Sequence, residues 1–351
     1  MVQIFEGGSF QERIYVINDD NTGVTGIIVL HSTVLGPAAG GCRFWHYDSQ
    51  GEMAADAVRL AKGMSYKNAL AGLPFGGGKA VIQRPEGDFD RRTVFKVFGE
   101  AVAALNGDYV TAEDVGTTMA DMRVVRQQTS YVAGLETAKG MAGGDPSPWT
   151  ALGVFQSMKA AAENVLQFEL RGATVAVQGI GNVGSGLCHL LKQHGANLVI
   201  ADVDETRAAV FATELGAKCV GADEIMEVDA DVFAPCALGG ILNVKSIPKL
   251  SARLICGGAN NQLASDADGI SLVEHGILYA PDYVVNAGGI INVSAEYLQE
   301  TTFQVEQRVN QISGRLIGIL QQALRQSRPP GTVADEMAQQ IIASTRKSEA
   351  A

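Results

Sequence analysis

Apolar and polar positions alternate along the first part of the chain with the two-residue period of half-buried strands. Residues 13–17 and 26–31 both follow this pattern, and a turn-forming cluster at 19–23 separates them. The pattern predicts a β-hairpin. From residue 52 to residue 64 the apolar positions recur at helical spacing instead, which predicts an amphipathic helix. Further elements expected before residue 130 are strands at 80–82 and 109–112 and helices at 91–105 and 117–128.

The pattern changes after the Gly-Gly-Asp-Pro-Ser-Pro sequence at residues 143–148. This is the clearest linker-like punctuation in the chain, so we expect a domain boundary in the region 130–150. Beyond it, short apolar segments alternate with helical ones, as in a parallel sheet with crossover helices. The strands predicted there are 173–178, 197–201, 231–234, 254–256 and 278–280. The helices are 150–165, 185–194, 290–300, 303–325 and 333–343.

Composition narrows the class of protein. The chain has 351 residues, enough for two domains, and 46% of them are apolar, so we expect a large core and no disorder. A net charge of −11 argues against nucleic acid or an anionic membrane as a partner. The N-terminus has no signal-peptide pattern, and no stretch reaches the length of a membrane span. Five cysteines without CxxC spacing suggest reduced thiols, a cytoplasmic protein and no metal site.

Residues 63–82 (GMSYKNALAGLPFGGGKAVI) hold the first candidate chemistry. Lys67 and Lys79 lie among small and apolar residues, where an ammonium group loses hydration and its pKa tends to fall. The three glycines before Lys79 suggest close backbone approach or unusual dihedral angles. A surface loop with two solvated lysines is the alternative. A phosphate-binding loop is excluded by its spacing. Leu73 stands where that motif has its first glycine, and Ala80 stands where it has a serine or threonine.

Asp114 follows the predicted strand at 109–112 in the sequence Glu113-Asp114-Val115-Gly116-Thr117. An acidic residue at the exit of a buried strand is a common position for a catalytic group. Asp114 is equally suited to cap the helix predicted at 117–128, since aspartate is a preferred N-cap. The residues alone leave both roles open.

The second chemical signal is a GxGxxG sequence between the predicted strand at 173–178 and the next helix. Asp202 ends the following strand. This order of strand, glycine turn, helix, strand and acid is the context of a dinucleotide-binding site. Asp202 would accept hydrogen bonds from the adenosine ribose and repel a 2′-phosphate, so NAD is expected as the cofactor. The turn residues expected to bind NAD are Gly179, Gly181, Asn182, Val183 and Gly184.

The later strands of this half end in small or polar residues. In an open parallel sheet the ligand lies at the carboxyl ends of the strands, so these ends should face the cofactor. A glycine-rich break at 286–292 follows the last of them. The cofactor-facing residues expected here are Cys236, Ala237, Ala259, Asn261 and Asn286.

Several motifs together resemble the glutamate/leucine/phenylalanine/valine dehydrogenases, and most closely their leucine and phenylalanine branch. They run in order from about residue 35 to residue 293: LGPAAGGCR, GMSYKNALAGLPFGGGKAVI, TAEDVGTT, GDPSPWTALGV, VAVQGIGNVG, PCALGG, GGANNQL and NAGGIINV. The resemblance implies an α/β fold with two domains. Residues 1–132, joined by the C-terminal helix at about 325–351, would form the substrate-binding and oligomerisation domain. Residues 133–324 would form a Rossmann-type NAD-binding domain.

The resemblance also implies a reaction and a set of roles. The reaction is the reversible oxidative deamination of an L-amino acid to its 2-oxo acid and ammonia, in a homo-oligomer. Lys67 would bind the α-carboxylate, with backbone contacts from Gly40 and Gly41. Lys79 would activate water, and Asp114 would exchange protons with the amino group. Thr150 would contact the nicotinamide carboxamide, and Asn261 would contact the nicotinamide ribose or the substrate amino group.

The resemblance further suggests which side chain the substrate carries. Glutamate-specific members have a lysine at the position of Ala39 and a serine at the position of Val293. Because burying an unpaired carboxylate costs several kcal/mol, glutamate is not expected here. The residues expected to line an apolar side-chain site are Ala39, Ala112, Ile290 and Val293. Leucine enzymes usually carry leucine where this chain has Ala39, so leucine, valine, phenylalanine or a broad range of substrates stays open.

Two other classes of protein would share part of this pattern. A 2-hydroxy-acid dehydrogenase would use a histidine as its acid/base, but none of the five histidines lies in a glycine-rich strand exit. A non-catalytic NAD-sensing module would keep the glycine turn and Asp202 without needing Lys67, Lys79 and Asp114 together. The retention of all three favours an enzyme.

Overall fold

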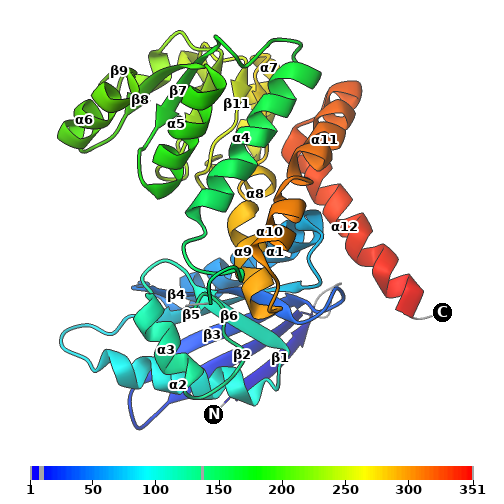
Figure 1. Cartoon of the computed structure of the whole chain (residues 1–351). Coiled ribbons are helices and arrows are strands. Elements are labelled where there is room, and N and C mark those ends of the chain that lie inside the picture. Colours follow the sequence, from blue (N-terminus) through cyan, green and yellow to red (C-terminus); the bar gives the residue numbers. More distant parts are fainter. Residues whose placement is uncertain (1, 8–11, 136–137, 350–351) are drawn as a thin grey trace. The chain divides into compact units, whose positions relative to one another are not determined.

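The computed structural model of the chain describes residues 2–7, 12–135 and 138–349 (Figure 1). It divides into two compact units. Unit 1 comprises Met1–Gly144, Asn292–Thr302 and Ala338–Ala351, and unit 2 comprises Asp145–Ile291 and Phe303–Met337. The expected boundary after residue 132 therefore falls inside unit 1. The C-terminal segment joins unit 1 from Ala338 onward, within the last helix.

A six-stranded sheet in the order β1-β2-β3-β5-β4-β6 forms the centre of unit 1. The predicted hairpin is confirmed, since β2 and β3 are antiparallel neighbours joined by the turn after Asp19. Strand β4 runs parallel to both β5 and β6, which lie on either side of it. The strands are β1 (Val2–Gly7), β2 (Glu12–Asp19), β3 (Val24–Ser32), β4 (Ala38–Trp45), β5 (Gly76–Gln83) and β6 (Tyr109–Glu113).

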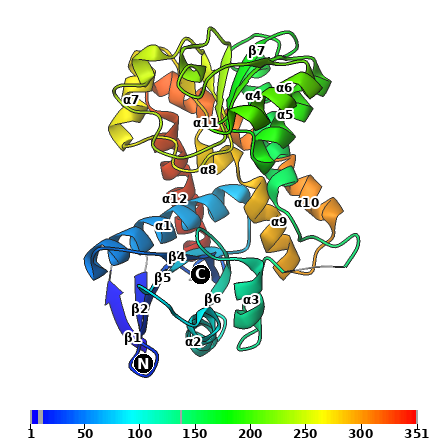
Figure 2. The same ribbon diagram turned by 90° about the vertical axis from the view of Figure 1, so that its left-hand side faces the viewer.

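Helices cover both faces of this sheet (Figures 1 and 2). Helix α1 (Gln50–Ala71) lies on one face, where Met53, Ala57 and Ala61 pack against Ile27, Val29 and Val81. Ser49 caps its first turn by accepting a hydrogen bond from the Glu52 N–H at 3.2 Å. The other face packs against α2 (Arg91–Ala104) and α3 (Met119–Arg126) through a core that includes Phe95, Phe98 and Met122.

Glycines let α1 approach the sheet closely. A Cβ added at Gly77 would lie 2.0 Å from the backbone nitrogen of Ser65 on α1, and one at Gly40 would lie 1.8 Å from the carbonyl oxygen of Gly78. Gly76, Gly77 and Gly78 have ordinary negative φ values. Close approach, of backbone atoms at Gly76 and Gly77 and of the Tyr109 ring at Gly78, therefore accounts for the three successive glycines better than an unusual dihedral angle.

The glycines before Lys79 are part of strand β5, so the surface-loop alternative for them is wrong. The segment around Gly40, for which no strand was predicted, is strand β4. Glycine carries no hydrophobic signal, so neither strand shows a two-residue period. The helix predicted to end at residue 64 continues to Ala71, so Lys67 lies on a helix.

Unit 2 contains a parallel six-stranded sheet in the order β12-β11-β10-β7-β8-β9. Strand β7 lies at the centre, with successive strands added outward on both sides, which is the order of a dinucleotide-binding Rossmann sheet. The five predicted strands are confirmed within one or two residues, as β7 (Thr174–Gln178), β8 (Asn197–Ala201), β10 (Val232–Pro235), β11 (Leu254–Ile255) and β12 (Leu278–Tyr279). The sixth strand is β9 (Lys218–Cys219).

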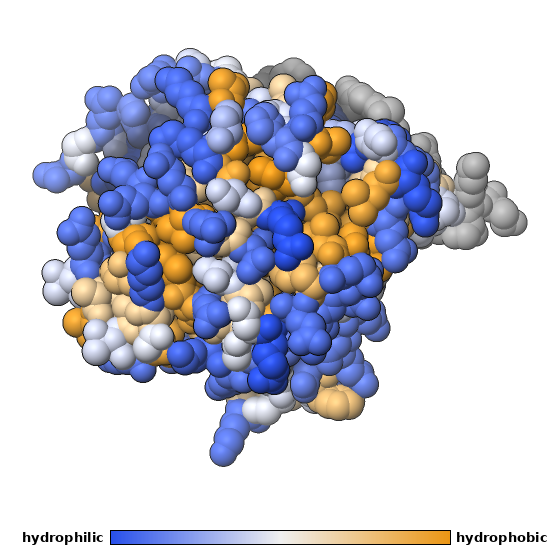
Figure 3. Space-filling model, turned by 90° about the horizontal axis from the view of Figure 1, so that it is seen from above, coloured by the Kyte–Doolittle hydropathy of each residue, from blue (hydrophilic) through white to orange (hydrophobic). Residues whose placement is uncertain are grey.

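Some elements of the second half differ from expectation. The helix predicted over 303–325 is two helices, and the short strand β9 and helices α6, α7 and α8 were not predicted. The helices after α3 are α4 (Ser147–Asn164), α5 (Asn182–His194), α6 (Glu205–Leu215), α7 (Asp266–Glu274), α8 (Asp282–Val285), α9 (Gly288–Tyr297), α10 (Thr302–Val309), α11 (Ile312–Gln326) and α12 (Pro330–Glu349). Within the described residues, no helix is both long and apolar enough to cross a membrane. On the face in Figure 3, hydrophobic side chains are interspersed with hydrophilic ones.

Candidate active site

Lys79 is held at the centre of the unit 1 sheet. It lies in β5, where it pairs with Val29 of β3, and its side chain is on the same face as Val81, toward α1. The residue is only 4% exposed, and its Nζ lies 2.7 Å from Oδ2 of Asp114. Burial lowers the pKa of Lys79 below its ordinary value, although Asp114 acts to raise it. A buried lysine with this shift can exchange protons.

Asp114 follows the last residue of β6, in a turn that fixes its backbone. Its N–H donates to Oγ1 of Thr117 at 2.8 Å, and that hydroxyl lies 2.8 Å from the Asp114 carbonyl oxygen. Gly116 in the same turn has φ +81°, and a Cβ there would lie 1.9 Å from the carbonyl oxygen of Phe44. The capping role considered for Asp114 is wrong, because Thr118 caps α3.

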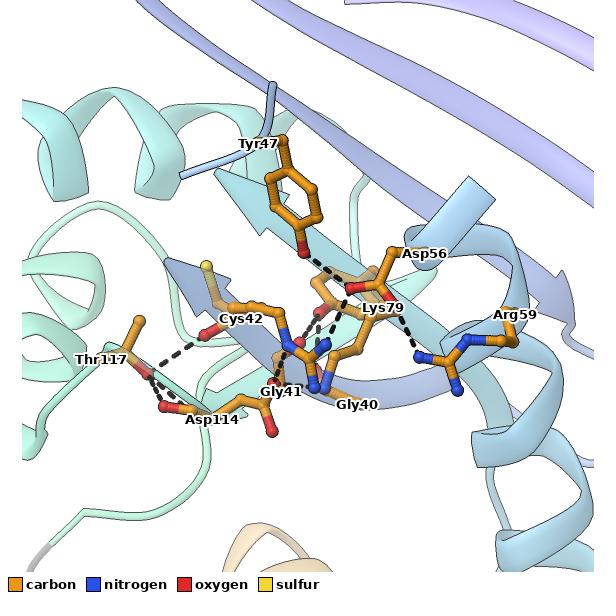
Figure 4. Close-up of polar contacts among 11 residues, drawn as sticks. Gly40, Gly41, Cys42, Tyr47, Asp56, Arg59, Lys79, Asp114 and Thr117 are labelled. Carbon is orange, nitrogen blue, oxygen red and sulfur yellow. Dashed lines mark hydrogen bonds and ion pairs between the residues drawn. The ribbon is translucent and has the colours of Figure 1, made fainter. Parts of the chain in front are cut away.

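Asp114 stays ionised in this environment. Burial raises the pKa of its carboxyl, but Lys79 and then Arg43 outweigh burial and hold that pKa below its usual range. Arg43, on β4, places its Nε 3.3 Å from Oδ2 of Asp114 (Figure 4). Arg43 was not among the site residues predicted from the sequence. The signal that could have indicated it is its position two residues after Gly41, which puts both on one face of the strand.

Gly40 and Gly41 lie in β4 beside Lys79, where the sheet pairing has a break. On one side they pair with Thr111 and Ala112 of β6. On the other side, the described pairing with β5 stops at Ala39–Gly77 and resumes at Cys42–Ala80. A Cβ on Gly41 would lie 2.8 Å from Cβ of Asp114. The absence of a side chain at Gly41 therefore makes room for Asp114.

The other expected substrate residues lie on three elements of unit 1 and on α9. Lys67 is half-buried on α1, Ala39 is buried in β4, and Ala112 is half-buried in β6. Val293 and Ile290 are both half-buried on α9, but Val293 belongs to unit 1 and Ile290 to unit 2. The four residues expected around the substrate side chain thus do not all fall in one unit.

The glycine turn of unit 2 has the geometry of a phosphate-binding turn. Gly179 has φ +90°, and a Cβ on Gly184 would lie 1.9 Å from the Gly179 carbonyl oxygen, so both positions require glycine. Gly181 faces open space, and it is the N-cap of α5 without a side-chain hydrogen bond. The turn also holds Asn182 and Val183, the first two residues of α5. The first N–H groups of that helix can therefore meet a phosphate group.

Asp202 directly follows strand β8 and connects to this turn. Its Oδ2 accepts a hydrogen bond from the Ile180 N–H at 2.8 Å, and its Oδ1 lies 2.8 Å from the guanidinium of Arg207. The Asp204 N–H also donates to Oδ1 at 3.0 Å. Although burial raises the pKa of Asp202, these donors hold it below the usual range. Arg207, which was not among the residues predicted from the sequence, offsets part of the negative charge of Asp202.

Two further expected cofactor residues lie against the glycine turn. Ala237 would contact a Cβ on Gly179 at 2.8 Å, and Cys236 would contact one on Gly184 at 3.2 Å. Ala259 is buried, and its N–H donates to the Pro235 carbonyl oxygen at 2.9 Å. These three residues follow the ends of β10 and β11, as expected.

The last three expected cofactor residues are polar. Asn286 donates to Oδ1 of Asn260 at 2.7 Å, and its own Oδ1 is buried without a partner among the described residues. Asn261 is exposed and has φ +52°. Thr150 is 9% exposed and donates to the Pro146 carbonyl oxygen at 3.1 Å. The open helix N-terminus at Gly181 and the unpartnered oxygen of Asn286 both fit a dinucleotide with an amide-bearing ring.

The described residues contain no cluster of three histidine, cysteine, aspartate or glutamate side chains that could hold a metal ion. The candidate chemistry is therefore that of Lys79, Asp114 and Arg43 in unit 1 and of the glycine turn in unit 2.

A Rossmann sheet with this turn, together with a buried lysine–aspartate pair in a separate unit, defines a dehydrogenase that uses a nicotinamide cofactor. The chain belongs to the Glu/Leu/Phe/Val dehydrogenase family. The dimerisation domain of that family matches residues 10–131, and the Glutamate/Leucine/Phenylalanine/Valine dehydrogenase domain matches residues 145–211 and 200–343. The chain is thus an oxidoreductase that acts on a CH–NH₂ group, and the family expected from the sequence is confirmed.

The names of the relatives include several different amino-acid substrates. The chain is 45% identical over 338 residues to a leucine dehydrogenase of Geobacillus stearothermophilus, covering 96% of this chain and 92% of that one. It is 42% identical over 345 residues to a valine dehydrogenase of Streptomyces coelicolor, covering 97% and 94%. The crystal structure of L-tryptophan dehydrogenase from Nostoc punctiforme superposes with a TM-score of 0.85 and 38% identity, covering 98% of this chain and 96% of that one.

Proposed function

We propose that this protein catalyses the reversible NAD-dependent oxidative deamination of an apolar L-amino acid to its 2-oxo acid and ammonia. The observation that carries the proposal is the buried pair of Lys79 and Asp114, with Nζ and Oδ2 at 2.7 Å. Burial favours the neutral, basic form of Lys79. The pair thus combines a lysine whose basic form is favoured by burial with a carboxylate that is ionised at rest.

The protein residues would divide the reaction between them. Lys67 pairs with the substrate α-carboxylate, and backbone groups of Gly40 and Gly41 orient it. A nicotinamide cofactor, when bound, accepts the hydride from the substrate Cα. Lys79 then removes a proton from the water that attacks the resulting iminium carbon. Asp114, ionised at rest, takes a proton from the substrate ammonium group before the hydride leaves Cα and returns it to the nitrogen of the carbinolamine. The carbon–nitrogen bond then breaks, ammonia leaves, and the hydroxyl proton is released to solvent as the 2-oxo group forms.

NAD is the cofactor proposed, on the basis of Asp202. A carboxylate at the end of the second strand accepts hydrogen bonds from ribose hydroxyls and disfavours a 2′-phosphate. Gly179, Gly181 and Gly184 would bind the pyrophosphate with the adjoining residues Asn182 and Val183. The nicotinamide half would be held by Thr150, Asn261 and Asn286, with Cys236, Ala237 and Ala259 beside it.

Apolar amino acids are proposed as substrates because every residue expected around the side chain is apolar. Ala39, Ala112, Ile290 and Val293 offer no partner to a second carboxylate, whose burial unpaired would cost several kcal/mol. Leucine and valine are the first candidates. The small Ala39, 6% exposed, favours aromatic substrates as a second candidate, and an L-tryptophan dehydrogenase is among the relatives.

Two further features belong to this proposal. The N-terminal part matches a dimerisation domain, which supports a homo-oligomer. The five cysteines are all unpaired thiols, which suits the reducing cytoplasm.

The test is the formation of NADH at alkaline pH with a panel of L-amino acids, with NAD⁺ compared with NADP⁺. We expect turnover of apolar amino acids and none of glutamate. Lys79→Ala should lower kcat by about 10²–10⁴-fold or more and leave NADH binding, followed by its fluorescence, nearly unchanged. Lys96→Ala is the control, since Lys96 is 59% exposed and pairs only with Glu100 among the ion pairs described. Turnover that survives Lys79→Ala would contradict the role of Lys79.

A further inference from the structure

Arg43 contacts the carboxylate oxygen that Lys79 also contacts. Its Nε lies 3.3 Å from Oδ2 of Asp114, and Lys79 Nζ lies 2.7 Å from the same oxygen (Figure 4). One anion is therefore shared by two cations. Only one of the two, Lys79, has a proton to exchange in the proposed reaction.

A second carboxylate anchors Arg43 from helix α1. The guanidinium Nη1 lies 2.8 Å from Oδ2 of Asp56, and the Tyr47 hydroxyl donates to that same oxygen at 2.6 Å. Arg59 donates to the other oxygen of Asp56 at 2.6 Å. Arg43 thus spans the distance between α1 and the turn after β6. The rigid, branched guanidinium can serve both carboxylates, whereas a lysine ammonium at this position is a single point charge.

The titratable groups around Lys79 come from three neighbouring elements. The turn after β6 contributes Asp114, and β4 contributes Arg43 and the Cys42 thiol. Burial raises the pKa of Cys42 well above its ordinary value, so that thiol stays neutral. Helix α1 contributes Asp56 through Arg43, and Lys67 lies about three turns further along the helix.

Arg43 is charged at every pH at which the protein works. Burial alone would lower its pKa, but Asp114 and Asp56 outweigh burial and raise it above its ordinary value. A fixed positive charge beside Lys79 disfavours a second positive charge there. The same charge stabilises the carboxylate of Asp114.

We propose that Arg43 is a positioning residue of the deamination reaction. It holds the carboxylate of Asp114 against Lys79, and its permanent charge favours the neutral form of Lys79 that acts as the base. This inference rests on the roles proposed above for Lys79 and Asp114. A purely structural Arg43 would cross-link β4 to α1 and leave the proton exchange of Lys79 unchanged.

The positioning role and the purely structural role of Arg43 predict different pH profiles of kcat/KM for oxidative deamination. This profile rises with pH as Lys79 loses its proton. In Arg43→Gln we expect the rising limb to move up by about one pH unit, so that kcat/KM at a pH on that limb falls about tenfold. In Arg43→Lys the positive charge is kept, so the limb should stay within a few tenths of a unit of the wild type while kcat falls.

Two further variants keep the test decisive. The double variant Arg43→Gln/Asp56→Asn removes the charge together with its partner carboxylate on α1, and it should shift the limb as Arg43→Gln does, even if the single variant does not fold. Arg13→Gln is the matched control, because it breaks another arginine–aspartate pair of unit 1, with Arg13 Nη1 2.6 Å from Oδ2 of Asp108. It should leave the profile unchanged.

The outcomes separate this inference from the proposed function. If the wild-type protein oxidises no amino acid, the proposed function fails and Arg43 has no reaction to assist. If the wild type is active and the limbs of Arg43→Gln and the double variant coincide with the wild-type limb, the positioning role is wrong and Arg43 is a structural cross-link.

Discussion

Nζ of Lys79 lies 2.7 Å from Oδ2 of Asp114, yet the pKa of Lys79 is below its ordinary value. An opposite charge at this distance normally raises a lysine pKa. Here burial of the ammonium, in a residue only 4% exposed, outweighs the carboxylate. Arg43 acts in the same direction as burial. Two charged neighbours therefore act on one lysine with opposite sign, and each can be removed separately.

Removal of the carboxylate should shift the pH profile in the opposite direction to removal of Arg43. Asp114→Asn takes away the anion that raises the pKa of Lys79, so the rising limb of kcat/KM should move to lower pH. The maximal rate should fall by about 10²–10⁴-fold, because a proton-transfer group is lost. Asp108→Asn is the control, since it breaks the half-exposed pair with Arg13. A limb that moves to higher pH in Asp114→Asn would contradict the effect assigned to Asp114 on the pKa of Lys79.

The size of residue 39 should decide between aliphatic and aromatic substrates. Ala39 lies in β4 opposite Gly77 and directly before Gly40. Ala39→Leu adds three carbons where a large side chain would need space. We expect kcat/KM for L-phenylalanine to fall at least about tenfold, whereas that for L-valine changes by less than about threefold. Ala55→Leu, on the exposed side of α1, provides the control. An unchanged ratio of the two substrates would remove Ala39 from the side-chain site.

Asp202 and Arg207 together should set the preference for NAD over NADP. Their side chains are 2.8 Å apart, so loss of the carboxylate also frees the guanidinium. In Asp202→Ser we expect KM for NAD⁺ to rise about tenfold and kcat/KM for NADP⁺ to rise by a similar factor, because a 2′-phosphate then meets Arg207 alone. The double variant Asp202→Ser/Arg207→Gln should lose the gain with NADP⁺. Steady-state kinetics with both cofactors tests this, and no gain in Asp202→Ser would contradict it.

Much of unit 2 could be predicted from the sequence. Its central strands are continuous apolar runs, and GxGxxG followed by Asp202 is a local pattern of about one βαβ unit. Gly179 is needed for its φ of +90° and Gly184 for its close approach to the Gly179 carbonyl oxygen, and both conditions lie inside that unit. The strands and the turn were therefore located to within a few residues.

Unit 1 was harder to predict, for physical reasons. Strands β4 and β5 contain five glycines between them, which carry no hydrophobic period, so both were missed or shortened. The order β3-β5-β4-β6 places strands side by side that do not follow one another in the chain. Arg43 meets Asp114 across 71 positions of sequence. No local pattern indicates such a contact, although the family motifs did indicate Lys79 and Asp114.

The close packing of α1 against β5 gives a prediction about both the stability of the protein and its binding of the amino acid. A Cβ at Gly77 would lie 2.0 Å from the nitrogen and 2.4 Å from the Cα of Ser65, and both are backbone atoms of α1. Gly77→Ala therefore forces α1 away from the sheet, at a cost of about 1–3 kcal/mol or more. Lys67 is two residues beyond Ser65 on the same helix. The midpoint of thermal unfolding should fall, and KM for the amino acid should rise more than KM for NAD⁺.

The chain provides a matched control for this change at Gly63. This glycine lies inside α1, and a Cβ there would meet nothing within 4 Å. Gly63→Ala should stabilise the protein by about 0.5–1 kcal/mol, because alanine favours the helix over the unfolded chain. The same chemical substitution thus has opposite predicted signs at two positions fourteen residues apart. Equal unfolding midpoints for the two variants would show that α1 does not rest on Gly77. A lower midpoint for Gly77→Ala with an unchanged KM for the amino acid would show instead that α1 does not carry the carboxylate-binding residue.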